Sequence, residues 1–153
     1  MDGGATDNPW KPRPVADGEW AGWGRYDTDP FENLTGPFYC RPDPDGGMVC
    51  AFRAEQRHMN GSGSMHGGCM ATFADYAIFM IADKELEGSG SVTAQLSTEF
   101  LGGAEVGELI EARGEVTKAG NSLVFVRGVG TTGGRPVFSF SAIIKKVRSR
   151  HSA

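Results

Sequence analysis

The most distinct pattern along the chain is a run, residues 67–82, in which apolar side chains occur on almost every side of a helix. The run contains a single Asp or Glu, which is Asp75, and no Lys or Arg. A helix that is apolar nearly all round is a buried one. The pattern therefore predicts a long central helix that carries one carboxylate in its third turn.

Four stretches after this helix alternate between apolar and polar residues, as strands with one covered and one solvated face do. These stretches are 91–101, 108–116, 122–130 and 136–146. KAGN and TTGGR predict hairpin turns between the last three, and DPDGG predicts another between strands at 38–41 and 48–53. Only the long helix is apolar enough to cover such a sheet. The order predicts an α+β fold in which an antiparallel sheet of five or six strands wraps around one central helix.

Residues 1–28 have no sustained period of 2 or 3.6 residues and hold three tryptophans among Gly, Pro and Asp. We expect an irregular N-terminal arm, either packed on the domain through its tryptophans or left as a mobile tail. Asp29 and Pro30 then indicate the start of a short helix. A chain of 153 residues suits one domain with a sizeable core, which we place at 29–147, before a basic tail at 148–153.

Charge and cysteine content exclude several classes of protein. A net charge of −4 from 15 basic and 19 acidic residues, spread along the chain, gives no reason to expect nucleic acid as a partner. Three cysteines without CxxC spacing indicate neither a disulfide framework nor a zinc ribbon. No apolar run reaches the length of a secretory signal or of a membrane span, which needs about 20 residues. We therefore expect a cytoplasmic protein with no membrane partner.

The start of the long helix offers a site for negative charge. Gly67 and Gly68 open it, where the first backbone N–H groups have no partner within the helix and the helix dipole is positive. Without a Cβ, Gly67 lets a carbonyl oxygen approach its N–H, as an oxyanion hole for acyl transfer requires. The alternative is that the Gly-Gly pair only permits a tight turn into the helix.

Asp75 lies too deep in the helix to be an N-cap. It is either a working carboxylate or the buried partner of an arginine such as Arg127 or Arg113. Two polar residues precede the helix. His66 is either a hydrogen-bonding residue at the helix start or a proton carrier, and Asn60, in a Gly-rich loop, is typical of a turn.

Metal and phosphate chemistry find less support. His58, His66, Cys69 and Asp75 carry ligand atoms, but the sequence has no HExxH, no CxxC and no repeated carboxylate pattern. GSGSMHGG lacks the lysine of a phosphate-binding GxxxxGK[ST] loop, and no GxSxG nucleophile motif occurs. We therefore expect neither a metal nor a redox cofactor.

The run NGSGSMHGGCMATFAD at 60–75, followed by TAQLSTEF at 93–100, resembles the hotdog-fold acyl-CoA thioesterases of the phenylacetic-acid-pathway type. These are related to the 4-hydroxybenzoyl-CoA thioesterases. The similarity covers roughly residues 30–147. It is fairly specific, because Asn, His-Gly-Gly, Asp and a later Ser or Thr occur at matching intervals. The resemblance implies a hotdog fold and hydrolysis of an acyl-CoA thioester.

The same resemblance implies roles for five residues. Asp75 matches the catalytic carboxylate, and Gly67 matches the residue whose N–H polarises the thioester carbonyl. Asn60 and Thr93 match positions that orient water or the carboxylate, and His66 matches the histidine beside the oxyanion glycine. Asp75 acts either as general base on a water or as a nucleophile that forms a mixed anhydride. Some relatives carry Glu and Ser at the positions of Asp75 and Thr93.

Two other functions stay open. The first is a hotdog hydratase or dehydratase acting on enoyl or hydroxyacyl thioesters, which depends on a differently placed His and acid that this sequence does not show. The second is a non-catalytic acyl-CoA binding domain, in which Asp75 is only structural. We expect substrate contacts from Gly68 and from Lys145, whose basic segment KKVRSRH either meets the CoA phosphates or is simply solvated.

A length argument predicts a shared site. Eight residues at about 1.5 Å each place Gly67 and Asp75 roughly 12 Å apart along one helix, too far for both to touch one thioester carbon. If both act, two subunits must meet with their helices antiparallel across a two-fold axis. The resemblance implies the same homodimer, with Asn60 and Gly67 from one chain and Asp75 and Thr93 from its partner, often paired into tetramers. Strand alternation further predicts that Thr93 faces this cleft and Leu96 the opposite side.

Overall fold

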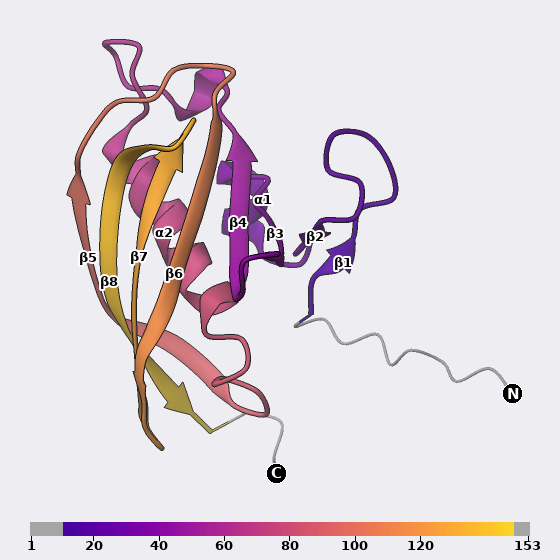
Figure 1. The fold of residues 1–153 in the computed structure, drawn as a ribbon, viewed down its shortest axis with the longest axis vertical. Coiled ribbons are helices and arrows are strands. Elements are labelled where there is room, and N and C mark those ends of the chain that lie inside the picture. The colour runs from indigo at the N-terminus through magenta and orange to yellow at the C-terminus, as the bar shows by residue number, and fades with distance from the viewer. Residues whose placement is uncertain (1–10, 149–153) are drawn as a thin grey trace, which may run out of the picture.

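A single antiparallel sheet curves around one long helix, α2 (Gly67–Ile81), in the computed structural model, which describes residues 11–148 (Figure 1). The sheet has the strand order β1-β2-β3-β4-β6-β7-β8-β5. Its long strands are β4 (Met48–Arg53), β5 (Gly90–Phe100), β6 (Leu109–Ala119), β7 (Leu123–Thr132) and β8 (Arg135–Val147). The predicted α+β arrangement of hairpin, central helix and antiparallel meander is confirmed.

The shorter elements precede α2 along the chain. They are β1 (Arg13–Pro14), β2 (Gly24–Arg25), α1 (Pro30–Thr35), β3 (Tyr39–Pro42) and the 3₁₀ turn η1 (Gln56–His58). The sheet has eight strands rather than five or six, because the N-terminal arm adds β1 and β2 beyond β3. Each of these two strands is only two residues long, so neither shows a period in the sequence.

The main core fills the space between α2 and the inner face of the sheet. Phe73 and Ile78 of α2 are fully buried, as are Phe52, Ile110 and Phe138 on the strands. Every residue of α2 except Gly68 is buried or half-buried, which explains why the helix carries no Lys or Arg. None of the helices within residues 11–148 is long and apolar enough to cross a bilayer.

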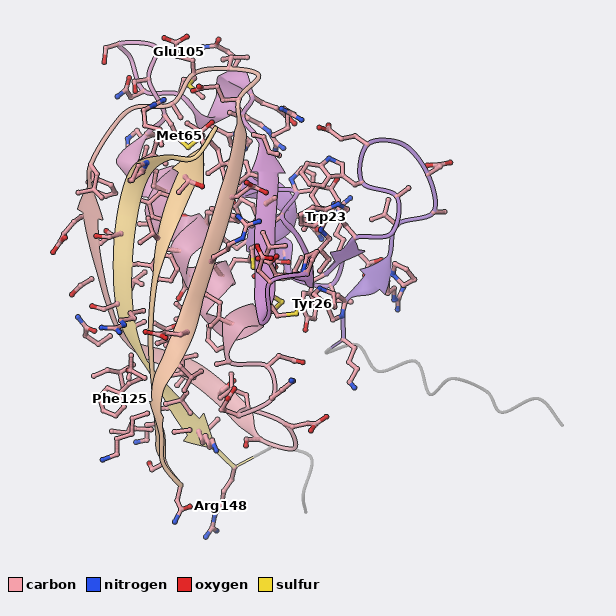
Figure 2. All side chains as sticks on the ribbon, viewed as in Figure 1. Trp23, Tyr26, Met65, Glu105, Phe125 and Arg148 are labelled. Atoms are coloured by element: carbon pink, nitrogen blue, oxygen red, sulfur yellow. The ribbon has the colours of Figure 1, made fainter. Side chains whose placement is uncertain are left out.

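A second, smaller cluster lies on the outer face of the sheet. The Trp20 ring stacks on Tyr39 of β3 at 4.1 Å, and the Arg41 guanidinium lies 4.4 Å from the centre of the Trp23 ring. Figure 2 shows Trp23 on the side of β4 where the arm runs. The arm is therefore attached to the domain through the packing of Trp20 and Trp23 and through the β1–β2–β3 pairing, although most of residues 11–22 are exposed. Trp10 lies outside the described residues.

The edge strand β5 contains an irregularity that changes which side chains face α2. Its register with β8 shifts between Thr93 and Gln95. Thr93 pairs with Ile144 and Leu96 with Ala142, and both of these partners are buried against the core. Thr93 and Leu96 therefore share the helix-facing side. The prediction that Leu96 faces away from Thr93 is wrong, because a bulge inserts one residue into the alternation.

Candidate active site

The backbone N–H of Gly67 has no hydrogen-bond acceptor among residues 11–148, because α2 begins at this residue. The next N–H is occupied. Nδ1 of His66 accepts a hydrogen bond of 2.8 Å from Gly68 N–H, so His66 is the N-cap of α2. Gly67 is therefore the glycine of the pair whose N–H is left unpaired by the described residues, at the positive end of the helix dipole.

Phe100 covers one side of this helix start. A Cβ on Gly67 would lie 3.1 Å from the Phe100 ring, tighter than ordinary packing. Glycine at this position is therefore explained by a close contact as well as by access to its N–H. The sequence analysis did not find Phe100, since the contact joins the end of β5 to the start of α2.

Asn60 organises the loop before the helix. Its Oδ1 accepts hydrogen bonds from Ser62 N–H at 3.0 Å, from the Ser62 hydroxyl at 2.9 Å and from Ser64 N–H at 3.2 Å. The turn role expected for Asn60 is confirmed. Its Nδ2 donates to none of the described residues, so the amide N–H groups remain free for a water or a ligand.

Asp75 is held by Thr93. The Thr93 hydroxyl donates a hydrogen bond of 2.6 Å to Asp75 Oδ1, a length typical of a bond to a carboxylate. The bulge in β5 turns Thr93 toward α2 and so makes this contact possible. Asp75 is half-buried, and Oδ2 is not engaged by any other described residue.

Neither arginine suggested as a partner reaches Asp75. Arg127 binds Glu115 through two nitrogens at 2.8 and 2.6 Å. Arg113 binds Asp43 at 2.5 Å. Both arginines bind carboxylates other than Asp75, so the interpretation of Asp75 as a buried ion-pair partner of either arginine is wrong.

A second carboxylate lies near Asp75. Glu32 is half-buried in the first turn of α1, where its N–H donates to the side chain of Asp29 at 2.9 Å. Burial raises the pKa of Glu32 to about 7, with further increases from the charges of Asp29 and Asp75. The sequence analysis missed Glu32, since only the packing of α1 against α2 brings it into this field.

The predicted residues form two groups within one chain. Asn60, His66 and Gly67 gather at the start of α2, the end of the molecule where Figure 2 labels Met65. Asp75 and Thr93 lie two turns further along. Lys145 joins neither group: it is exposed on β8, and its neighbour Ile144 faces the core, so Lys145 points to the other face of the sheet.

A hollow of about 670 Å³ on the outer face of β5–β8 does not adjoin these residues. Outward-facing side chains such as Glu115, Arg127 and Ser139 line it, and they alternate with residues that face the core. The sheet separates this hollow from Asp75.

Comparison with known proteins identifies the family. A family model described as "Thioesterase superfamily" matches residues 62–138, about half of the chain. A Pseudomonas aeruginosa protein that is named as an esterase is 33% identical to this chain over 117 residues. The match covers 76% of this chain and 87% of the relative. The chain belongs to the thioesterase superfamily. The predicted resemblance to thioesterases is confirmed, and this thioesterase is a thioester hydrolase.

Two further relatives extend the comparison. This thioesterase is 28% identical over 95 residues to human acyl-coenzyme A thioesterase 13, covering 62% of this chain and 68% of that protein. A Bacillus halodurans protein crystallised with CoA superposes with a TM-score of 0.73 at 23% identity, over 82% of this chain and 83% of that one. The latter likeness shows that the thioesterase has the hotdog fold predicted from the sequence.

Proposed function

We propose that this thioesterase hydrolyses acyl-CoA thioesters to a free acid and CoA, with Asp75 as the catalytic carboxylate. The observation that carries the proposal is the setting of Asp75, which accepts a hydrogen bond from the Thr93 hydroxyl while Arg113 and Arg127 bind other carboxylates. A carboxylate in such a setting remains free to take a proton. CoA as the thiol is supported by the human relative and by the CoA-bound Bacillus structure.

The geometry supports a sequence of steps. The thioester oxygen accepts a hydrogen bond from Gly67 N–H, which stabilises the negative charge of the tetrahedral intermediate. Asp75 removes a proton from a water, and that water attacks the carbonyl carbon. Asn60 Nδ2 is free to donate to the same water. The carbon–sulfur bond then breaks, and the departing CoA thiolate takes up the proton that Asp75 removed from the water, which restores the carboxylate. Direct attack by Asp75, with hydrolysis of a mixed anhydride, is the alternative route.

The site is completed by a second copy of the chain in this proposal. Gly67 and Asp75 lie on one continuous 15-residue helix, roughly 12 Å apart along its axis. The edge strand β5 supports a partner, because it is 11 residues long and β8 is its one neighbour among the described strands. Long unpaired edges are templates for pairing with another chain. Two copies joined along β5 place their α2 helices antiparallel, and pairing of such dimers produces the tetramer expected from the family resemblance.

The remaining parts of the chain follow from this assignment. We assign the catalytic domain to residues 29–147, the arm to 1–28 and the basic tail to 148–153. In this proposal Lys145, which is exposed on β8 and lies outside both groups of site residues, binds the CoA phosphates as they extend away from the reacting carbonyl. The three free thiols favour a reducing, cytoplasmic location.

The test is release of thiol from a panel of acyl-CoAs by the wild type and by Asp75→Asn. We expect the wild type to release CoA and Asp75→Asn to be slower by about a hundredfold or more, with unchanged folding and CoA affinity. Undiminished turnover by a folded Asp75→Asn protein would refute the catalytic role of Asp75. Binding of acyl-CoA without thiol release would indicate a binding domain, and a changed enoyl absorbance without thiol release would indicate a hydratase.

A further inference from the structure

A hollow of about 440 Å³ lies between α1, η1 and the first turns of α2. Its walls are formed by Phe31, Leu34, Thr35, Arg57, His58, Met59, His66, Gly68, Cys69 and Thr72. Its volume falls within the range of small-molecule sites. The hollow reaches Gly68, the residue next to the N–H that the proposed function places at the thioester oxygen.

The rim of this hollow is apolar and exposed. Phe31 and Leu34 lie on α1 with 59% and 71% of their surface accessible. Two large apolar side chains on one turn of a helix, both bordering a hollow, are typical of a surface that binds an apolar ligand.

The wall on the α2 side is also effectively apolar. The Thr72 hydroxyl donates to Gly68 C=O at 2.8 Å, so its hydrogen-bonding capacity is used within the helix. Burial raises the pKa of the Cys69 thiol to about 11, against a lowering effect of Arg57, so this side chain is neutral at physiological pH. Neither residue offers a charged group to a ligand.

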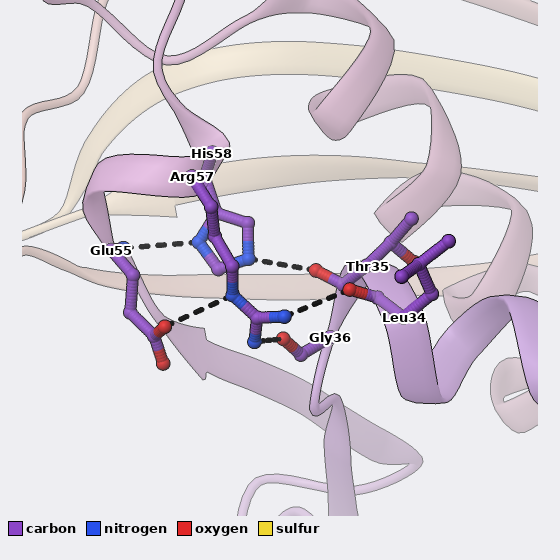
Figure 3. Close-up of polar contacts among 6 residues, drawn as sticks. All are labelled: Leu34, Thr35, Gly36, Glu55, Arg57 and His58. Atoms are coloured by element: carbon purple, nitrogen blue, oxygen red, sulfur yellow. Dashed lines mark hydrogen bonds and ion pairs between the residues drawn. The ribbon is translucent and has the colours of Figure 1, made fainter.

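The position of α1 is held by two residues from η1 (Figure 3). Arg57 donates to Leu34 C=O at 2.8 Å and to Gly36 C=O, while His58 Nε2 bonds Thr35 C=O at 2.7 Å. These carbonyls end α1 and have no partner within the helix. The third guanidinium nitrogen binds Glu55 at 3.0 Å. All three guanidinium nitrogens of Arg57 are thus engaged, two of them with backbone carbonyls that position α1.

We propose that this hollow binds the acyl group of the substrate and that Phe31 and Leu34 select apolar acyl groups larger than acetyl. The inference rests on the proposed function, which sets the thioester carbonyl at Gly67. From there the acyl chain extends past Gly68 along the wall of α1, while an acetyl group ends before reaching it. Arg57 and His58 act as positioning residues, since they hold α1 without contacting the reacting atoms.

The experiment measures kcat/KM for acetyl-, butanoyl-, hexanoyl- and octanoyl-CoA. Each methylene buried in an apolar site raises kcat/KM by roughly fourfold. Octanoyl-CoA carries six more methylenes than acetyl-CoA, and burial of about three to four of them in the hollow should raise kcat/KM by on the order of a hundredfold. Leu34→Lys places a charge on the rim of the hollow. Because Leu34 is 71% exposed, the substitution should leave the melting temperature unchanged. The kcat/KM of this variant should fall at least about tenfold for octanoyl-CoA and less than about twofold for acetyl-CoA.

The matched control is Leu123→Lys, the same change at a position 37% exposed at the start of β7, which does not line the hollow. It should keep the wild-type preference. Equal losses on both substrates in Leu34→Lys, a selective loss in Leu123→Lys, or a wild type that prefers acetyl-CoA would each overturn the proposal. A wild type that releases no thiol at all would refute the proposed function instead. Weaker binding of octanoyl-CoA, but not of CoA, to Leu34→Lys would then still support the hollow as the acyl site, and equal binding would refute it.

Discussion

The hydroxyl of Thr93 donates a hydrogen bond of 2.6 Å to Asp75 Oδ1 across 18 residues of sequence. This bond joins the edge strand β5 to the third turn of α2. It restrains the carboxylate with one oxygen engaged and leaves Oδ2 for a water. A neutral partner orients Asp75 without neutralising its charge, as the general-base role proposed for Asp75 requires.

The role of the hydroxyl is tested by Thr93→Val, which keeps the shape of the side chain. We expect turnover to fall by about tenfold or more, because the carboxylate loses its orientation. The melting temperature should fall by only about 2–4 °C, corresponding to roughly one lost hydrogen bond in a chain of this size. Steady-state kinetics and thermal unfolding provide the two readouts. The control is Thr98→Val on the same strand, which should change turnover little, and a large loss of stability with normal turnover would make Thr93 structural.

The shared site is tested by mixing two inactive variants, Asn60→Ala and Asp75→Asn, under conditions where subunits exchange. Each mixed dimer then has one doubly damaged site and one intact site. Activity should approach about a quarter of wild type, since random exchange makes half of the dimers mixed and each has one working site of two.

A mixture of Asp75→Asn with Thr93→Val is the matched control for this experiment. Both changes fall in the same half of the site, so every site in a mixed dimer stays damaged. The activity of the mixture should therefore not exceed the average of the two separate variants. Exchange itself is verified by mass spectrometry of the dimers. Verified exchange without recovery in the first mixture would exclude the shared-site arrangement.

Glu32 predicts a pH dependence of stability. Its pKa is raised to about 7 in the folded state, so between pH 4.5 and 7 the folded chain binds more protons than the unfolded chain. The free energy of unfolding should therefore fall as pH rises through this window. We expect this decrease in the free energy of unfolding to be on the order of 1 kcal/mol after allowance for solvent screening. Glu32→Gln cannot ionise at this position and should abolish the decrease. Urea unfolding at pH 5 and pH 8 measures it.

Two further variants sharpen the Glu32 test. Glu87→Gln, at an exposed position after α2, should leave the pH dependence of stability unchanged. Asp75→Asn should lower the pKa of Glu32, because it removes one of the charges that raise it. A pH dependence that persists in Glu32→Gln would assign the effect to another group.

Arg57 and Arg127 should differ in their effect on stability although both bind carboxylates. Arg57→Ala leaves carbonyls at the end of α1 without donors and should lower the free energy of unfolding by about 1.5–3 kcal/mol. Arg127→Ala removes an exposed ion pair with Glu115 and should cost about 0–1 kcal/mol. Urea denaturation compares the two variants, and equal effects would contradict the positioning role of Arg57.

Much of the architecture could be predicted from local pattern. The apolar run at 67–82 predicts the central helix because burial of most of a helix's surface excludes Lys and Arg. The turns KAGN and TTGGR predict the β6–β7–β8 meander, because hairpin geometry depends on a few adjacent residues. The spacing of Asn60, Gly67 and Asp75 indicates the family, and the length of the helix indicates a second subunit. All of these depend on residues close together in sequence.

Only the tertiary structure decided the partners of the candidate site. Thr93 reaches Asp75 because a bulge shifts β5 against β8, and strict alternation does not anticipate that shift. Glu32 lies close enough to Asp75 for the charge of Asp75 to raise its pKa. Phe100 contacts Gly67 across 33 residues of sequence. The physical reason is that strand register and helix packing are set by the whole core at once. A sequence pattern records which side chains are buried, but the packed chain determines which of them meet.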